Sequence, residues 1–278
     1  MDWKGREQSQ NVEDRRGSSG GGGGRTPGIL GIIVVLIGAY YGVDLSGLVG
    51  TPSMGTGSTQ TSQLKPQEEA ELNELARVVL ADTEKAWGSY FKQIGRTYTP
   101  TTLVLYNGGT STACGMGQSA MGPFYCPGDK KVYLDLDFYR DMQTKLNSAS
   151  DAAFAYVIAH EVGHHVQNLL GILPKVHRMQ QQVDKKEANA LSVKLELQAD
   201  CYAGIWGHYA VNNNIFKAED ITKAMLAAES VGDDRLQKDG QGYVVPDSFT
   251  HGSSEQRMAW LKRGLDSGDI NQCNTFGN

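Results

Sequence analysis

The sequence contains no stretch dominated by lysine and arginine, and it contains no internal repeat. Acidic residues outnumber basic ones, 31 to 26, and the formal net charge is -5 at pH 7. A nucleic-acid-binding protein carries a basic patch or stripe, so we expect no nucleic-acid partner. Hydrophobic residues make up 40% of the 278 residues. That composition is enough to bury a core in one large domain or two small ones.

Charged residues are absent from Gly28 to Val43, and apolar character resumes after Asp44. A helix that spans a bilayer needs about 20 mostly apolar residues, and 28–50 reaches that length if Asp44 sits at the headgroup boundary. We expect a transmembrane anchor there rather than a buried core helix, because the flanking segments offer nothing to bury it. No small-x-small cleavage site follows closely, which favours a retained anchor over a removed signal peptide.

Basic residues are distributed unevenly around this apolar stretch. Arg15, Arg16 and Arg25 precede it, and the next lysine or arginine is Lys65. The positive-inside rule therefore predicts a single-pass membrane protein with a cytoplasmic N-terminus and an extracytoplasmic domain, in the periplasm or at the cell exterior. We expect a disordered cytoplasmic tail over 1–27, a flexible linker over 51–65 and a folded domain over 66–278.

Cysteine is scarce, and no Cys-x-x-Cys spacing occurs, which disfavours a cysteine zinc site. Four cysteines in an extracytoplasmic domain suggest two disulfides, with three possible pairings. Pairing Cys114 with Cys126 is the most economical, since it closes a short glycine-rich loop and stabilises the fold by about 3 kcal/mol in the chain-entropy model. Cys201 and Cys273 would then tie the C-terminal tail to a helix.

The hydrophobic periodicity predicts mostly helices, with strands clustered early in the domain. This pattern is typical of an α+β fold and not of an alternating parallel sheet. We expect helices over 67–93, 151–170, 186–211 and 218–232, one that begins within 139–146 and one that begins after Ser253. We also expect a strand over 101–107, a hairpin within 124–138, and a largely irregular segment over 233–252.

The stretch "HEVGHH" places His160 and His164 four residues apart, about 40° apart around a helix and opposite its apolar face. Two imidazoles one turn apart can bind a single zinc ion. Glu161 is offset by about 100°, so it can flank the metal and act as a general base but cannot easily be a ligand. His165 points toward the flank of the apolar face, and we expect it to be a packed or capping histidine. We interpret His177 and His208 as structural.

A third ligand is needed, because the five-residue motif alone also occurs by chance. Glu196 and Asp200 are four residues apart in an otherwise apolar helix, so they share one face. Glu196 as third ligand leaves the fourth position of zinc open, as a catalytic site requires. Asp200 can accept the far N–H of a zinc-bound histidine and fix its tautomer.

The blocks "AHEVGHHVQ", "LELQADCYAG" and "THGSSEQR" together resemble the putative neutral zinc metallopeptidases of bacteria, a membrane-anchored group. The His160-Glu161-x-x-His164 and Glu196-x-x-x-Asp200 pattern resembles the gluzincins. The resemblance covers most of 66–278 and implies a zincin-like, mini-gluzincin domain with one zinc ion. It also implies that Asp200 pairs with His160.

The resemblance further implies roles for the last block. His251 would stabilise the oxyanion, and Arg257 would brace the acidic residues behind the ligands; an exposed loop histidine and a surface ion pair are the alternatives. We expect peptide to bind as an added strand on a sheet edge, with Val132, Tyr133 and Leu134 in the edge strand.

Three hypotheses about function follow. The first is a zinc metalloendopeptidase that acts on peptide or protein substrates, with His160, His164 and Glu196 as ligands and Glu161 as base. The second is a membrane-anchored zinc protein that captures or chaperones peptides without cleaving them. The third, a cytosolic amide hydrolase of the deformylase kind, would need a cysteine ligand. The natural substrate and the oligomeric state stay open.

Overall fold

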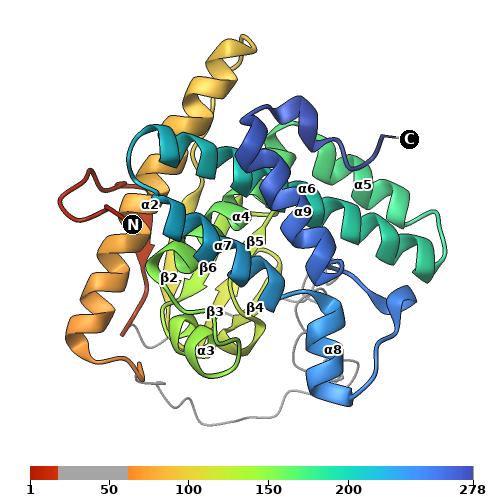
Figure 1. The fold of residues 1–278 in the computed structure, drawn as a ribbon, viewed down its shortest axis with the longest axis horizontal. Coiled ribbons are helices and arrows are strands. Elements are labelled where there is room, and N and C mark those ends of the chain that lie inside the picture. Colours follow the sequence, from red (N-terminus) through yellow and green to blue (C-terminus); the bar gives the residue numbers. More distant parts are fainter. Residues whose placement is uncertain (18–61, 278) are drawn as a thin grey trace.

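The computed structural model describes residues 1–17 and 62–277, shown as a ribbon in Figure 1. It is an α+β fold, mostly helical, as expected. The helices are α2 (Pro66–Gln93), α3 (Phe138–Thr144), α4 (Asp151–Leu169), α5 (Ile172–Gln180), α6 (Lys185–Asn212), α7 (Ala218–Ser230), α8 (Asp233–Gln241) and α9 (Ser254–Ser267), with short 3-10 turns at Ser119–Met121, Pro246–Ser248 and Ile270–Cys273.

A four-stranded sheet lies beside the helices in the order β1-β2-β6-β5. The pairs β1–β2 and β2–β6 are parallel, and β5–β6 is an antiparallel hairpin. The sheet strands are β1 (Val12–Asp14), β2 (Thr102–Tyr106), β5 (Phe124–Cys126) and β6 (Lys131–Asp135), and a separate hairpin consists of β3 (Gly109–Thr112) and β4 (Gly115–Gln118).

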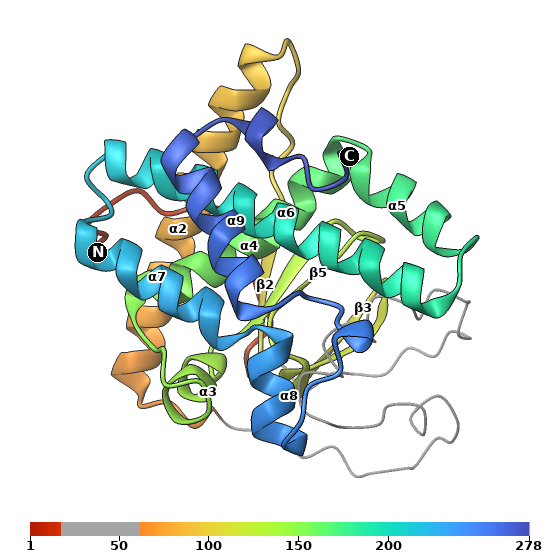
Figure 2. The same cartoon turned by 45° about the vertical axis from the view of Figure 1, so that its right-hand side comes forward.

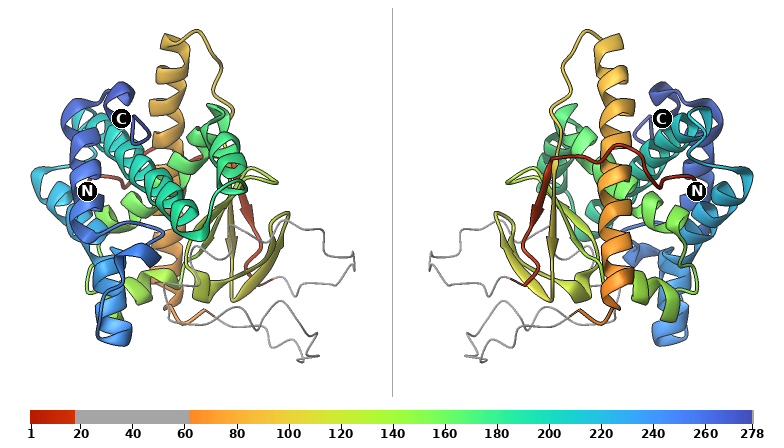
Figure 3. Two further views of the ribbon diagram at one scale, coloured as in Figure 1. Left: turned by 90° about the vertical axis from the view of Figure 1, so that its right-hand side faces the viewer. Right: turned by 90° about the vertical axis from the view of Figure 1, so that its left-hand side faces the viewer.

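The two faces of the sheet are buried in different clusters, because side chains alternate along each strand. One face faces the helical layer and joins the main core; it carries Leu103, Leu105, Tyr125, Val132 and Leu134. The other face forms a small cluster against the β3–β4 hairpin; it carries Val104, Tyr106, Phe124, Cys126 and Tyr133. Most of the helices therefore lie on one side of the sheet (Figure 3).

The helix that carries "HEVGHH" begins where the sequence predicts. The Ser150 side chain accepts a hydrogen bond from the backbone N–H of Ala153 and caps α4. Helix α6 crosses α4 closely at Gly163, where an added Cβ would lie 3.1 Å from the carbonyl oxygen of Ala199. A side chain at this position would push the two site-bearing helices apart.

Helix α9 packs closely against α6 (Figure 2). A Cβ added to Gly264 would lie 1.9 Å from the carbonyl oxygen of Cys201, so only glycine allows this approach. Helix α9 carries Arg257, so this contact sets where that side chain lies against α6. The disulfide Cys201–Cys273 ties the C-terminal segment to α6, and Cys114–Cys126 ties the β3–β4 hairpin to β5. Both predicted pairings are present.

The prediction of a disordered tail over 1–27 is wrong for residues 1–17. Residues 12–14 form β1 in the sheet, and the Trp3 side chain is buried in the main core. The sequence gives little sign of this, because the strand has three residues, two of them acidic, and its partner, β2, lies about ninety residues further along the chain. Residues 18–27 lie outside the described part.

The prediction of a flexible linker over 51–65 is wrong for its last residues. The backbone N–H of Gln63 donates to Asp137, and the Leu64 side chain is buried. The folded domain therefore begins at or before residue 62. The predicted anchor over 28–50 lies outside the described residues. Within residues 1–17 and 62–277, no helix combines the length and the apolar character that crossing a bilayer requires.

Two helices were not expected from the sequence. Helix α8 lies within 233–252, where we predicted an irregular segment, and α5 follows α4 after a short turn. Helix α8 is polar and has Leu236 as its one large apolar side chain, so it carries little of the periodicity that identifies a helix.

Candidate metal centre and active site

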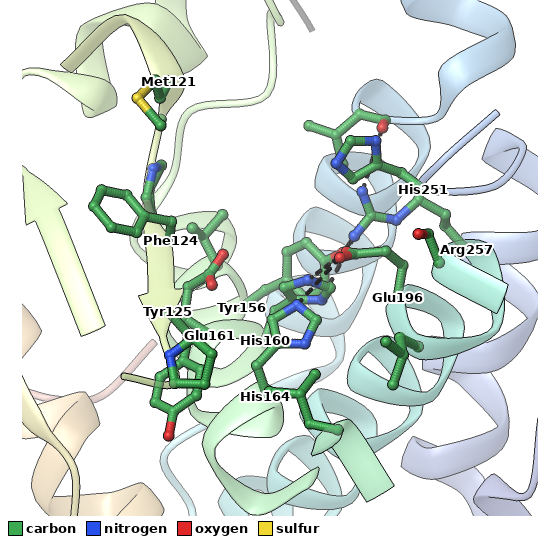
Figure 4. Close-up of a pocket in the computed structure, with 18 of the residues that line it drawn as sticks. Met121, Phe124, Tyr125, Tyr156, His160, Glu161, His164, Glu196, His251 and Arg257 are labelled. Atoms are coloured by element: carbon green, nitrogen blue, oxygen red, sulfur yellow. Dashed lines mark hydrogen bonds and ion pairs between the residues drawn. The ribbon is translucent and has the colours of Figure 1, made fainter. Parts of the chain in front are cut away.

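Three side chains from two helices converge at the bottom of one cavity. His160 and His164 project from α4, and Glu196 projects from α6 (Figure 4). Nε2 of His160 lies 3.0 Å and Nε2 of His164 lies 3.3 Å from the Glu196 carboxylate oxygens. One ligand atom from each residue falls within 4.8 Å of the others.

The hydrogen bonds behind the two histidines define their tautomers. The Gln167 amide nitrogen donates to the carbonyl oxygen of Leu195, so the Gln167 oxygen faces Nδ1 of His164 and must accept from it, at 2.9 Å. Nδ1 of His160 lies 2.8 Å from the Asp200 carboxylate and donates to it. Both Nε2 atoms are therefore left with lone pairs that point at the Glu196 carboxylate.

This group of acceptors needs a cation between its members. Zinc binds imidazole nitrogen and carboxylate oxygen, and three protein ligands leave one of its four positions open. The pKa of His160 reports the same electrostatics: burial lowers it, but Asp200 and Glu196 outweigh burial and raise it to about 10. The residues present therefore fit a zinc ion held by His160, His164 and Glu196.

Asp200 is the centre of a buried network behind the metal ligands. It is 0% exposed and accepts hydrogen bonds from three side chains. Nδ1 of His160 donates at 2.8 Å, the Tyr156 hydroxyl at 2.6 Å, and Arg257 donates twice, at 2.8 and 3.0 Å. Burial alone would raise the pKa of Asp200, but Arg257 and His160 lower it to about 2. Asp200 is therefore an anion that orients His160.

Glu161 lines the same cavity, on the β5 side of the metal centre (Figure 4). Its side chain is buried and makes no hydrogen bond to the two histidines or to Glu196. Burial raises the pKa of Glu161, and the neighbouring His160 and His164 counteract part of that effect. A carboxylate with a raised pKa is a stronger proton acceptor than an ordinary glutamate, as a general base requires.

His251 lies on the opposite side of the metal centre from Glu161 (Figure 4). Its Nδ1 lies 3.1 Å from Asp233, which also accepts the backbone N–H groups of Thr250, His251 and Gly252. Burial lowers the pKa of His251, but Asp233 outweighs it, and the net shift is upward. With Nδ1 held by Asp233, Nε2 is the nitrogen left for contacts in the cavity.

A family model described as "Putative neutral zinc metallopeptidase" matches residues 1–276. The chain belongs to this family. Uncharacterized protein YpfJ of Escherichia coli K12 is 54% identical over 287 residues, covering 100% of this chain and 99% of that protein. Uncharacterized protein Mb2605 of Mycobacterium bovis is 40% identical over 222 residues, covering 74% and 73% of the two chains. No solved structure matches the chain.

In this family member, the predicted substrate strand is misplaced. Val132, Tyr133 and Leu134 lie in β6, which is paired on both sides, with β2 and with β5, and cannot accept another strand. The edge strand beside the cavity is β5, whose Phe124 and Tyr125 line it. The sequence pattern could not show this, because both strands of a hairpin read alike until their neighbours are known.

The other three histidines lie in different places relative to the candidate metal centre. His165 points away from the ligand atoms and is fully buried, as expected of a packed histidine. His208 contacts the carbonyl oxygen of Leu265, far along α6 from the metal centre. His177 lines the cavity, which the interpretation of it as structural missed.

Two further residues of the site were missed from the sequence. Tyr156 precedes His160 by four residues on α4, so helical spacing could have placed both on one face. Asp233 offered no such signal, because it lies eighteen residues before His251 and approaches it only through the packing of α8 against the following loop.

Proposed function

We propose that the protein is a zinc-dependent metalloendopeptidase of the gluzincin type. The observation that carries the proposal is the combination of two imidazole acceptors and Glu196 at one point with a buried, unpaired Glu161 beside them. A structural zinc site would close the fourth position with a protein ligand and would have no use for this carboxylate. All four cysteines are paired, so no thiol can act as the ligand that a deformylase-like hydrolase requires.

When bound, zinc would polarise the scissile carbonyl group and lower the pKa of a water molecule toward 7. Glu161 takes the proton of the attacking water on its carboxylate and then delivers it to the leaving amine. Asp200 holds His160 in the tautomer that presents Nε2, and Gln167 does the same for His164. His251, whose protonated form Asp233 favours, donates from Nε2 to the oxyanion as charge develops there.

The peptide substrate binds along the free edge of β5. An extended peptide gains main-chain hydrogen bonds from an edge strand without demanding one sequence. The cavity beyond that edge has apolar walls, including Val157, Leu173 and Leu195, which favour a substrate with apolar side chains near the cleaved bond. Two disulfides favour an oxidising, extracytoplasmic compartment.

The test uses the purified full-length protein with casein and with a fluorogenic peptide. We expect bound zinc close to one ion per chain, hydrolysis that disappears after treatment with a chelator, and recovery when zinc is returned. A zinc-loaded protein that binds peptide stably and releases it intact would support the peptide-capturing alternative. A protein that binds neither zinc nor peptide would contradict both.

The pair Asp233–His251 predicts a specific pH dependence. Because Asp233 raises the pKa of His251, the imidazole stays protonated to higher pH, and its contribution is lost only as the pH rises through that raised value. Replacing Asp233 by Asn removes the charge that raises the pKa. The alkaline decline of kcat/KM should then move to lower pH in a pH–rate profile. An unchanged alkaline limb would rule out His251 as the titrating donor.

A further inference from the structure

His165 connects the metal-binding helix to the edge strand through a chain of hydrogen bonds. Its Nε2 lies 2.7 Å from the carbonyl oxygen of Thr99, which can only accept, so Nε2 carries the proton. Nδ1 must then accept, and the Tyr125 hydroxyl donates to it at 3.0 Å. The Asn168 amide in turn donates to the Tyr125 oxygen at 2.9 Å. Both ring nitrogens of His165 and the Tyr125 hydroxyl therefore have a partner of the right kind.

These hydrogen bonds reach β5, a strand that has few other contacts to hold it in place. β5 is an edge strand, hydrogen-bonded to β6 on one side only. Of its three residues, Phe124 and Cys126 face the outer cluster, and Tyr125 alone faces the helical layer. The distance between β5 and α4 therefore depends on how the Tyr125 side chain is held. Its ring packs edge-on against His165, with the ring centroids 5.5 Å apart.

We propose that His165 is a positioning residue that holds β5 at a set distance from His160 and His164. A peptide bound along β5 then presents its scissile carbonyl at the metal centre. The inference rests on the proposed peptidase function. A strand that is already held in place loses less freedom when the peptide binds, and β5 is paired on one side only, so tight peptide binding depends on this anchor.

The test compares Tyr125→Phe, His165→Phe and the double variant, each loaded with zinc. Each change removes at least one buried hydrogen bond between β5 and α4 and should raise KM for a peptide substrate about tenfold, with kcat and zinc content unchanged. The double variant should raise KM no further than Tyr125→Phe alone, because the Tyr125 hydroxyl is the group that both His165 and Asn168 contact. The matched control is His208→Phe, which removes a hydrogen-bonded histidine outside the cavity and should leave KM unaltered.

Hydrogen exchange gives a readout that does not depend on activity. Backbone amides of residues 124–126 should exchange faster in Tyr125→Phe and His165→Phe and stay as in the wild type in His208→Phe. If wild-type protein cleaves no peptide, the proposed function fails, while the exchange data still decide whether His165 holds β5. Wild-type KM together with wild-type exchange in Tyr125→Phe would overturn the inference, even if His165→Phe does not fold.

A second inference comes from the N-terminal segment. β1 pairs in parallel with β2 over Val12 to Asp14, and the Trp3 side chain, 3% exposed, donates from Nε1 to Asp151 at 2.8 Å. Asp151 is the first residue of α4, so the N-terminal segment contacts the metal-binding helix directly. Arg15 and Lys131 both contact Glu13, which adds charged contacts across the sheet.

The chain leaves and re-enters the described structure at neighbouring points. Arg16, close to the last described residue before the gap, donates to Glu69 in the first turn of α2 at 2.9 Å. Ser62, the first described residue after the gap, donates to Asp137 at 2.7 Å. Both ends of the intervening chain are thus held on one folded body.

The geometry points to residues 1–17 and the peptidase domain lying on the same side of any membrane that residues 28–50 meet. A single crossing would place β1 and β2 in different compartments, which their pairing forbids. This replaces the topology expected from the charge distribution, in which the N-terminus and the domain lie on opposite sides.

Cysteine labelling in the full-length chain tests this directly. Lys4 and Lys262 have side chains that are 72% and 61% exposed, and the native cysteines are all in disulfides. Lys4→Cys and Lys262→Cys are expressed separately and treated with a membrane-impermeant maleimide in spheroplasts, with lysed cells as the reference for full labelling. Equal labelling of the two positions is expected. Labelling of one and protection of the other would overturn the inference.

Discussion

Replacing Glu161 by Gln is expected to lower kcat for peptide hydrolysis by about 10³-fold, because the amide cannot take the proton of the attacking water. The zinc content should stay at the wild-type level, since Glu161 contacts none of the ligand side chains through a hydrogen bond and the three ligands are intact. The measurement is steady-state hydrolysis of a fluorogenic peptide, with zinc determined on the same sample.

Glu187→Gln serves as the control for this substitution. Glu187 lies exposed in the first turn of α6, on the helix that carries Glu196, and its loss changes the net charge by the same amount. It should leave kcat unchanged. Hydrolysis by zinc-loaded Glu161→Gln at the wild-type rate would remove Glu161 from the mechanism.

Replacing Arg257 by Met is expected to destabilise the fold by about 3–5 kcal/mol, because it leaves the Asp200 carboxylate buried without its charged partner. Arg257 is 5% exposed and makes two hydrogen bonds to Asp200, so the charge left behind cannot reach water. His160 then loses a well-oriented partner, and zinc affinity should fall about 10–100-fold. Denaturant unfolding and zinc titration measure the two effects.

Two other variants make this prediction specific. Arg263→Met, on the exposed side of the same helix, should change stability little. Arg257→Lys keeps the charge but lacks the planar fork that donates twice to one carboxylate, so it should restore only part of the stability. A stable Arg257→Met protein with wild-type zinc affinity would show that Asp200 does not depend on this arginine.

The candidate metal centre could be predicted from the sequence because its key residues follow helical spacing. His160 and His164 are one turn apart, as are Glu196 and Asp200, so each pair was placed on one helical face without knowing the fold. Tyr156 follows the same rule and was overlooked. The starts of two helices were also predictable from the sequence. Ser150 and Ser253 cap their helices, as their positions in the sequence suggest.

The contacts between segments that are distant in the sequence could not be predicted in the same way. Asp233 reaches His251, and Tyr125 reaches His165, through packing that no periodic pattern encodes. The edge strand was assigned to β6 because a hairpin does not reveal which of its strands has a second neighbour. The N-terminal strand was missed because three residues, two of them acidic, carry almost no strand signal.

The sequence by itself determined which residues could bind zinc and which glutamate could be the base, because these depend on side-chain chemistry and on the regular geometry of a helix. It also determined the two disulfide pairings, although only as the most economical choice. The tertiary structure decided the substrate edge, the partner of His251, the role open to His165 and the position of residues 1–17. These depend on which surfaces meet when the sheet and the helices pack, and that is set by the burial of the whole chain rather than by any one segment.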